Sequence, residues 1–266
     1  YCGWKYGSDG RCTEVPAHSE LEISPKACLT SHLAVERTGL IWVCLDDEPK
    51  YPVPAYPEFD DPLFRAVRVP PYEWECSAAR RVENLVDFAH FAWVHDGLLG
   101  DRNLPEVPDH DVRREGATLC FGEADKHQAH EGEKPERSNE RDGLPHKTGA
   151  LLADKTYQLT MPFTVLLNQR LPGNRLYQMF WTVSPTGPRQ SRTFTIMGRN
   201  YELDVDQDQK FLEFNALVIG QDRPIIESQR PEELSVDLSS EIQIRGADRV
   251  AVEYRRWLRE LAYSNS

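Results

Sequence analysis

The sequence predicts an α+β protein, with a β-rich N-terminal part and a larger unit in which long helices cover one face of a curved antiparallel sheet. Two observations in the C-terminal half carry this prediction. Three strand-like segments, at residues 156–170, 175–185 and 191–200, are separated by the turn sequences LPGN and PTGPRQ, as in an antiparallel meander. Helical segments follow at 204–231, which has acidic residues at its start, and at 247–261, which is amphipathic.

The first 47 residues contain two candidate β elements. KYGSDGRCTEVP, residues 5–16, predicts a hairpin in which Gly10 supplies the positive φ of a tight turn. LAVERTGLIWVCL, residues 33–45, predicts another strand or a pair of strands, with Cys44 as a buried thiol. This part is too short to be a whole domain with a good core.

A proline-rich segment separates the two parts. Five of the 19 prolines fall in DDEPKYPVPAYPEFDDP, and because proline fixes φ and removes a backbone donor, we expect residues 48–62 to be an extended surface crossing. The second domain is then 63–266, with strand-like patches at 64–79. Residues 123–149 almost lack large apolar side chains, which predicts a solvated loop. Three histidines of this loop are not favoured as metal ligands: His127, His130 and His146.

Composition and charge limit the partners. The 266 residues carry a net charge of −12, which argues against binding to nucleic acid or to an anionic membrane, since both need clustered Lys and Arg. Basic proteins and neutral small molecules are the expected partners. No stretch predicts a transmembrane helix or a signal peptide, and the six cysteines form no CxxC pair, so reduced thiols in the cytoplasm are expected. The chain starts without an initiator methionine, which indicates an N-terminally incomplete sequence.

The stretch NLVDFAHFAWVHDGLLG places Asp87, His90 and His95 within nine residues of an apolar, aromatic run. On an ideal helix the two histidines lie about 140° apart, so both can reach one ion only if the helix is distorted between them or ends near His95. Gly97 and Gly100 favour the second arrangement. The alternative is that both histidines are partly buried helix residues with backbone partners.

Two neutral imidazoles and one carboxylate form a facial triad that leaves positions on Fe(II) open for O2 beside a substrate. The two histidines are present here. If Asp87 instead forms a hydrogen bond with the second ring nitrogen of an iron-binding histidine, the carboxylate ligand must come from elsewhere in the chain.

The motifs resemble those of Rieske non-haem iron oxygenases, in the oxygenase (α) component. ENLVDFAH followed by FAWVH matches the family pattern NxxDxxHxxxxH, and YCGWKYGSDGRCTEVPA resembles the end of the cluster-binding segment, with GLIWVCLDD resembling the strand after it. IGQDRPIIESQRP and DRVAVEYRRWL resemble the subgroup of vanillate O-demethylase, phthalate oxygenase and dicamba monooxygenase. The resemblance covers nearly the whole chain, in the family's order.

The resemblance implies a role for each matching residue. His90, His95 and Asp222 correspond to the ligands of the mononuclear iron, with Asp222 expected just after the long helix. Asp87 corresponds to the aspartate that links an iron-binding histidine to a cluster-bound histidine across a subunit boundary, and Asn84 has at most an orienting role. Without such roles, Asp222 would only cap the turn that follows it and Asp87 would be solvated.

The cluster segment departs from the family pattern. A Rieske 2Fe-2S cluster needs two cysteines and two histidines, as a CxH pair and a CxxH pair. The first pair and the second cysteine would lie before Tyr1, and Cys2 stands where the family has the last histidine. A thiolate there would lower the cluster potential and remove the imidazole that Asp87 would contact.

The resemblance further implies a fold and a reaction. Residues 1–47 would be the end of a Rieske domain, and 63–266 a helix-grip catalytic domain with a hydrophobic pocket above the iron, in a head-to-tail homotrimer. The cofactors would be mononuclear Fe(II) and a 2Fe-2S cluster, with electrons from NAD(P)H through a reductase, with or without a ferredoxin. The reaction would use O2 to hydroxylate or demethylate an aromatic or other apolar compound, and ring dihydroxylation stays open. A helix-grip module that binds an apolar ligand without redox chemistry is the alternative, and a zinc hydrolase is a weaker one, since no general base like that of HExxH is present.

Overall fold

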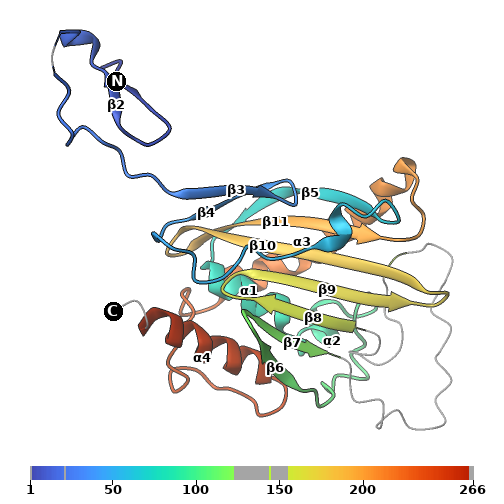
Figure 1. Ribbon diagram of the computed structural model, residues 1–266. Helices are drawn as coiled ribbons and strands as arrows, with labels where there is room; N and C mark the ends of the chain where they lie inside the picture. Colours follow the sequence, from blue (N-terminus) through green and yellow to red (C-terminus); the bar gives the residue numbers. More distant parts are fainter. Residues whose placement is uncertain (1, 21, 123–143, 145–154, 264–266) are drawn as a thin grey trace. The chain divides into compact units, whose positions relative to one another are not determined.

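The computed structural model describes residues 2–20, 22–122, 144 and 155–263 (Figure 1). The chain divides into two compact units, Tyr1–Val53 and Pro54–Ser266. The division falls within the proline-rich segment. His127, His130 and His146 lie outside the described residues. Within the part of the chain that is described, no helix is long and apolar enough to cross a membrane.

The N-terminal unit consists of two short hairpins and a 3-10 turn. Its elements are β1 (Lys5–Tyr6), β2 (Cys12–Glu14), η1 (Pro16–His18), β3 (Leu33–Arg37) and β4 (Leu40–Cys44), with β1 paired to β2 and β3 to β4. Gly10 has φ 78°, as predicted, and a Cβ atom there would lie 2.5 Å from the carbonyl oxygen of Leu29. The prediction that Cys44 is buried is wrong: β4 belongs to a two-stranded sheet, so its side chain is only partly covered, and all six cysteines are free.

The larger unit is built on one seven-stranded antiparallel sheet, which confirms the predicted fold class. The spatial order is β5-β11-β10-β9-β8-β7-β6. The strands are β5 (Arg65–Trp74), β6 (Val112–Glu115), β7 (Thr118–Gly122), β8 (Lys155–Thr160), β9 (Thr164–Leu171), β10 (Arg175–Gly187) and β11 (Gln190–Arg199). The segment predicted as one strand at 156–170 is in fact the β8–β9 hairpin, because the chain turns between Thr160 and Thr164. Strands β6 and β7 were not predicted from the sequence.

Helices lie against one face of this sheet, as Figure 1 shows for α1 and α4. They are α1 (Ala78–Val86), α2 (Phe91–Val94), α3 (Asp208–Ser228) and α4 (Arg249–Tyr263), with 3-10 turns η2 (Pro57–Phe59) and η3 (Val205–Gln207). Ser77 begins α1 as an N-cap whose side chain accepts a hydrogen bond from the backbone N–H of Arg80 at 3.2 Å. Because α1 contacts β9, β10, β11, α3 and α4, it is the central support of the helical layer.

The opposite face of the sheet is covered by residues that precede β5. Tyr56 is buried, stacks on Phe180 of β10 with ring centroids 5.2 Å apart, and donates a hydrogen bond to Gln178 at 3.3 Å. Successive residues of a strand point to opposite faces. Gln178 and Phe180 therefore belong to this side, and Tyr177 and Met179 to the helical side.

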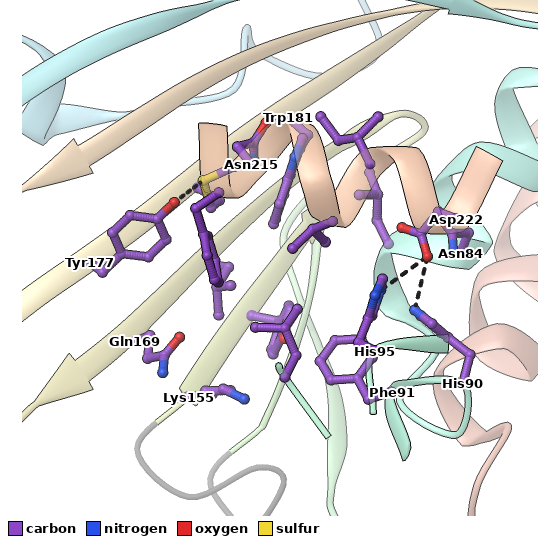
Figure 2. A pocket seen from close by; sticks show the side chains of 18 of the residues that line it. Asn84, His90, Phe91, His95, Lys155, Gln169, Tyr177, Trp181, Asn215 and Asp222 are labelled. Carbon is purple, nitrogen blue, oxygen red and sulfur yellow. Dashed lines mark hydrogen bonds and ion pairs between the residues drawn. The ribbon is translucent and has the colours of Figure 1, made fainter. Parts of the chain in front are cut away.

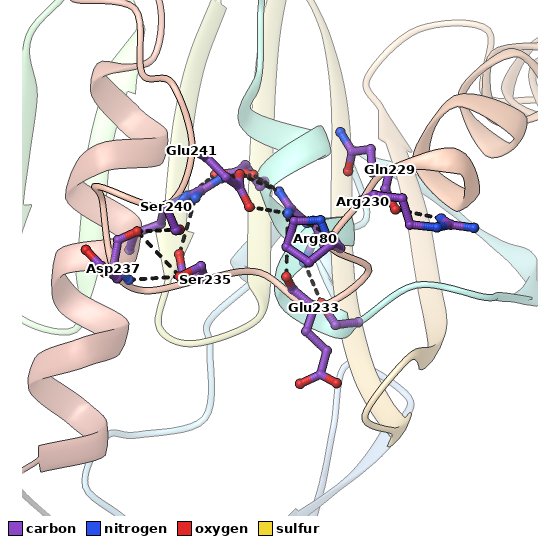
Figure 3. Close-up of polar contacts among 12 residues, drawn as sticks. Arg80, Gln229, Arg230, Glu233, Ser235, Asp237, Ser240 and Glu241 are labelled. Carbon is purple, nitrogen blue, oxygen red and sulfur yellow. Dashed lines mark hydrogen bonds and ion pairs between the residues drawn. The ribbon is translucent and has the colours of Figure 1, made fainter.

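A buried ion-pair network fastens α1 to α4 and to the segment that joins α3 to α4. Arg255 of α4, only 2% exposed, donates to Glu83 of α1 at 2.7 Å and to Glu241 at 2.8 Å. Figure 3 shows Arg80 of α1 beside Glu241, to which it donates as well, while it also donates to the carbonyl oxygen of Pro231 at 2.9 Å. Two arginines and two glutamates thus balance in charge, which offsets much of the cost of burying each of them.

Replacing Arg255 with methionine is expected to lower the free energy of unfolding by about 3 kcal/mol, because it leaves two partly buried carboxylates with one arginine between them. Chemical denaturation measures this change. The matched control is Arg256→Met, one residue along, where the side chain is 50% exposed and pairs with Glu253. That substitution is expected to change stability by less than about 0.5 kcal/mol. Equal effects of the two substitutions would contradict a structural role for the network.

Candidate metal centre

The histidine motif lies where one helix ends and another makes a single turn. Helix α1 ends at Val86 with Asp87 as its C-cap, His90 is the N-cap of α2, and His95 is the C-cap at its other end. The chain is therefore not one continuous helix from Asp87 to His95. The predicted end of the helix near His95 is confirmed, and this break allows both imidazole rings to face the same point.

Asp222 of α3 meets the two histidines there. Its Oδ1 lies 3.0 Å from Nε2 of His95 and 3.5 Å from Nε2 of His90, as the dashed lines of Figure 2 mark. One ligand atom from each of the three residues lies within 4.8 Å of the others. His95 is 1% exposed and Asp222 7%, so the three groups are largely shielded from water. Asp222 thus contacts His90 and His95, although it lies 132 and 127 positions after them in the chain.

The second ring nitrogen of each histidine, Nδ1, also has a hydrogen-bond partner. Nδ1 of His95 lies 2.7 Å from Oε1 of Gln221, and Nδ1 of His90 lies 3.2 Å from Oδ2 of Asp87. Both partners are acceptors, so in the neutral imidazoles each Nδ1 carries the proton and each Nε2 presents a lone pair. Two bare nitrogens and an anionic oxygen then face one another in a buried place. A cation between them would turn this repulsion into attraction, and His-His-Asp is the donor set that suits non-haem iron.

The pKa shifts of His95 and Asp222 also indicate a site that favours positive charge. Burial lowers the pKa of His95, but the hydrogen bond and the charge of Asp222 raise it, and the net shift is upward. Burial raises the pKa of Asp222, while the hydrogen bond of His95 and the charges of His90 and Arg81 lower it, and the net shift is downward. The site therefore favours an ionised carboxylate and attracts a proton or another cation.

Two residues of this site were missed by the sequence analysis. Gln221 precedes Asp222 on α3 and orients His95. Arg81 of α1 is 1% exposed, donates to Tyr72 at 2.7 Å and to Asn84, and lies 4.3 Å from the ring centroid of Trp74. No spacing rule marks a glutamine or an arginine as the support of a distant ligand, because the contact depends on how α1 and α3 pack.

Asn84, Asp222 and Cys2 were also predicted from the sequence to have roles in the site. Asn84 is buried at the wall of the pocket, where its side-chain oxygen accepts a hydrogen bond from Arg81. Asp222 lies within α3, which continues to Ser228, so the expectation that it follows the helix is wrong, and it caps no turn. The helix continues there because its next turn still packs against the core through Ile226. Cys2 is exposed and belongs to the N-terminal unit.

The three converging groups lie at one end of a pocket between the helices and strands β8 to β10. Met179 and Trp181 line it. Leu166 and Asn168 pair with Phe180 and Gln178 in the sheet register and therefore lie on the opposite face. Most of the lining is apolar, but Nε2 of Gln169 and Oδ1 of Asn215 are buried without a hydrogen-bond partner in the described part of the chain. Such a wall suits a largely apolar ligand with a few polar groups.

Comparison with known proteins agrees with this architecture. Residues 74–264 match the family described as the vanillate O-demethylase oxygenase C-terminal domain. The methylxanthine N3-demethylase NdmB of Pseudomonas putida is 34% identical over 266 residues, which cover 99% of this chain and 69% of that protein. The N1-demethylase NdmA of the same organism is 34% identical over 263 residues, 98% of this chain and 69% of that protein.

Solved structures give the same result. The structure of Pseudomonas putida CBB5 NdmA with caffeine has a TM-score of 0.81 at 32% identity and covers 98% of this chain and 70% of that one. Dicamba monooxygenase bound to dicamba, at 17% identity and a TM-score of 0.70, covers 99% of this chain and 79% of that one, and shows a shared fold. The chain thus belongs to the Rieske non-haem iron oxygenases, as an oxygenase α component of the vanillate demethylase-like group, and is an oxidoreductase.

Proposed function

We propose that this protein uses O2 to demethylate a methylated aromatic or heteroaromatic compound at an iron ion held by His90, His95 and Asp222. The observation that carries the proposal is the convergence of two imidazole nitrogens and one carboxylate oxygen at the end of a largely apolar pocket. Bound there, Fe(II) supplies the ability to activate O2 beside a substrate.

The residues around the ligands have separate tasks. Gln221 and Asp87 accept the Nδ1 protons of His95 and His90, which keeps both Nε2 atoms directed at Asp222. The apolar wall excludes water and holds the substrate's methyl group next to the three ligands. Asn84 supports the wall through its contact with Arg81.

The exposure of Asp87 supports a role for it as an electron-transfer link. Its Oδ2 contacts His90 and its Oδ1 accepts a hydrogen bond from the backbone N–H of Ala89, while the side chain remains 36% exposed to a further group. We propose that residues 1–47 belong to a Rieske domain that carries a 2Fe-2S cluster, and that this domain serves the iron of a neighbouring subunit in a homotrimer. Electrons would come from NAD(P)H through a reductase, with or without a ferredoxin. Cys2 stands at the position of a cluster histidine.

N-demethylation is the preferred form of the reaction. The two relatives that are 34% identical over nearly the whole chain are methylxanthine N-demethylases, and the related NdmA structure contains caffeine. Oxidation of a methyl group by O2, two electrons and two protons yields water and an unstable hydroxymethyl product, which releases formaldehyde and leaves an N–H or O–H group.

Metal analysis combined with formaldehyde release tests this function. Purified protein is expected to contain about one mononuclear iron per chain beyond any cluster iron, and the dithionite-reduced protein should release formaldehyde from caffeine or 4-methoxybenzoate when O2 is admitted. Stoichiometric zinc without iron, or iron without formaldehyde from either compound, would overturn the proposal. Protein treated with a chelator is the control and should release none.

Replacing Asp87 with asparagine is expected to separate iron binding from electron delivery. The amide still accepts the Nδ1 proton of His90 but carries no charge, so iron content should stay within about twofold while steady-state turnover with NADH and a reductase falls about 10- to 100-fold. Iron analysis and formaldehyde assays measure the two quantities. Asp96→Asn, at a nearby exposed aspartate that pairs with Arg102, is the control and should leave both unchanged. Loss of iron in the Asp87 variant would show a purely structural role.

A further inference from the structure

One row of the sheet inside the pocket is polar. Lys155 of β8, Gln169 of β9 and Tyr177 of β10 are direct partners in register, so their side chains lie side by side on the face that lines the cavity. The next row is largely apolar and consists of Tyr157, Leu167 and Met179. In Figure 2, Gln169 and Lys155 lie across the cavity from Asp222. The cavity therefore has an iron-ligand end and a separate polar end.

Gln169 carries a donor in this row that has no partner among the described residues. Its side chain is 3% exposed, and its Nε2 is buried there without a hydrogen-bond acceptor. A buried amide donor that is left unsatisfied is destabilising. Because Gln169 lines the pocket, a ligand in the pocket could supply the missing acceptor.

The neighbours of Gln169 determine which chemistry fits. Lys155, 5% exposed, is a buried cation whose Nζ lies 5.7 Å from the ring centroid of Phe91. Burial lowers the pKa of Lys155 to about 8, so the ammonium is still mostly protonated at pH 7. The hydroxyl of Tyr177 already donates to Sδ of Met179 at 3.0 Å. The polar row thus presents N–H donors and a positive charge, which favour a ligand oxygen.

We propose that Gln169 is a specificity-determining residue, whose amide N–H binds a carbonyl or carboxylate oxygen on the edge of the substrate remote from the methyl group that is oxidised. This inference rests on the proposed function and narrows its substrate class to methylated rings that carry such an oxygen. The Lys155 ammonium adds to the binding of the same oxygen edge. An apolar methylated ring would leave the Gln169 donor unsatisfied and would bind more weakly.

The test compares two probes that differ only at this edge, together with caffeine as a third. 4-Methoxybenzoate carries a carboxylate, 4-methoxytoluene has a methyl group in the same place, and caffeine carries ring carbonyls. Their Kd values are measured by calorimetry on the protein and on its Gln169→Leu variant. The substitution is expected to weaken binding of 4-methoxybenzoate, caffeine or both about tenfold, the factor that corresponds to one lost hydrogen bond, and to change 4-methoxytoluene less than twofold. The probe that binds more tightly to the unsubstituted protein distinguishes a carboxylate from a carbonyl.

Gln178→Leu is the matched control. Gln178 is equally buried and lies on the adjacent strand, but it faces the opposite side of the sheet, where it contacts Tyr56 and Asn168. Its variant should lose stability and keep all three Kd values. Four outcomes would each overturn the inference. Neither oxygen-bearing probe binds to the unsubstituted protein, or Gln169→Leu leaves all affinities unchanged. Gln169→Leu weakens the binding of 4-methoxytoluene as much as that of the oxygen-bearing probes, or Gln178→Leu weakens binding as much as Gln169→Leu does. Repeating the titrations on chelator-treated protein separates this outcome from a failure of the iron proposal, because these Kd values do not depend on turnover.

Discussion

Replacing Asp222 with asparagine is expected to lower the affinity for iron at least about 100-fold and to abolish measurable formaldehyde release. Loss of a residue that merely orients a metal ligand costs 10- to 100-fold, so loss of the anionic ligand itself should cost more. Without the carboxylate, only the neutral nitrogens of His90 and His95 remain at the centre. Iron content after extensive dialysis, together with formaldehyde assays, measures the effect.

Asp237→Asn provides the control for this substitution. Asp237 is an exposed aspartate in the segment between α3 and α4, where it accepts hydrogen bonds from Ser239, and it makes no contact with the histidines. Its variant should retain iron and activity. If the Asp222 variant kept its iron, the assignment of the third ligand would be wrong, whatever the activity.

Replacing Gly100 with alanine is expected to destabilise the protein by about 3 kcal/mol or more and to reduce iron binding with it. Gly100 lies directly behind α2, where an added Cβ would be 2.1 Å from the carbonyl oxygen of Phe91 and 2.6 Å from the amide nitrogen of Ala92. Both obstacles are backbone atoms, so no side-chain rotation can relieve the clash, and α2 must shift with His90 and His95 at its two ends. Thermal unfolding and iron content measure the two effects.

Gly220 offers the contrasting substitution. It lies within α3, two residues before Asp222, and nothing lies within 4 Å of an added Cβ. Alanine there should therefore raise stability by roughly 0.5–1 kcal/mol, because it restricts the unfolded chain and favours the helix. A destabilised Gly220→Ala variant, or a Gly100→Ala variant as stable as the unsubstituted protein, would contradict the packing described for α2 and α3.

The elements that the sequence predicted well are those with strong local signals. The meander followed by two long helices appears in the structure, and glycines near His95 correctly indicated the end of a helix. The single strand expected at 156–170 became a hairpin, because the turn at Met161 to Phe163 carries one proline and no glycine to mark it. β6 and β7 are short, and their neighbour β8 follows a long polar stretch, so no periodic pattern joined them to the meander.

The sequence by itself indicated that a helix ends near His95, which allows His90 and His95 to face one ion, and that Asp87 is near enough to orient one of them, because these relations span only nine residues. The resemblance to Rieske oxygenases then pointed to Asp222. Tertiary structure alone decided that Gln221 and Arg81 support the site, that Leu166 and Asn168 face away from the pocket, and that Lys155, Gln169 and Tyr177 form one polar row. Each of these depends on strand register or on the packing of α1 against α3. Both result from burying apolar surface across the whole domain, so no short stretch of sequence can specify them.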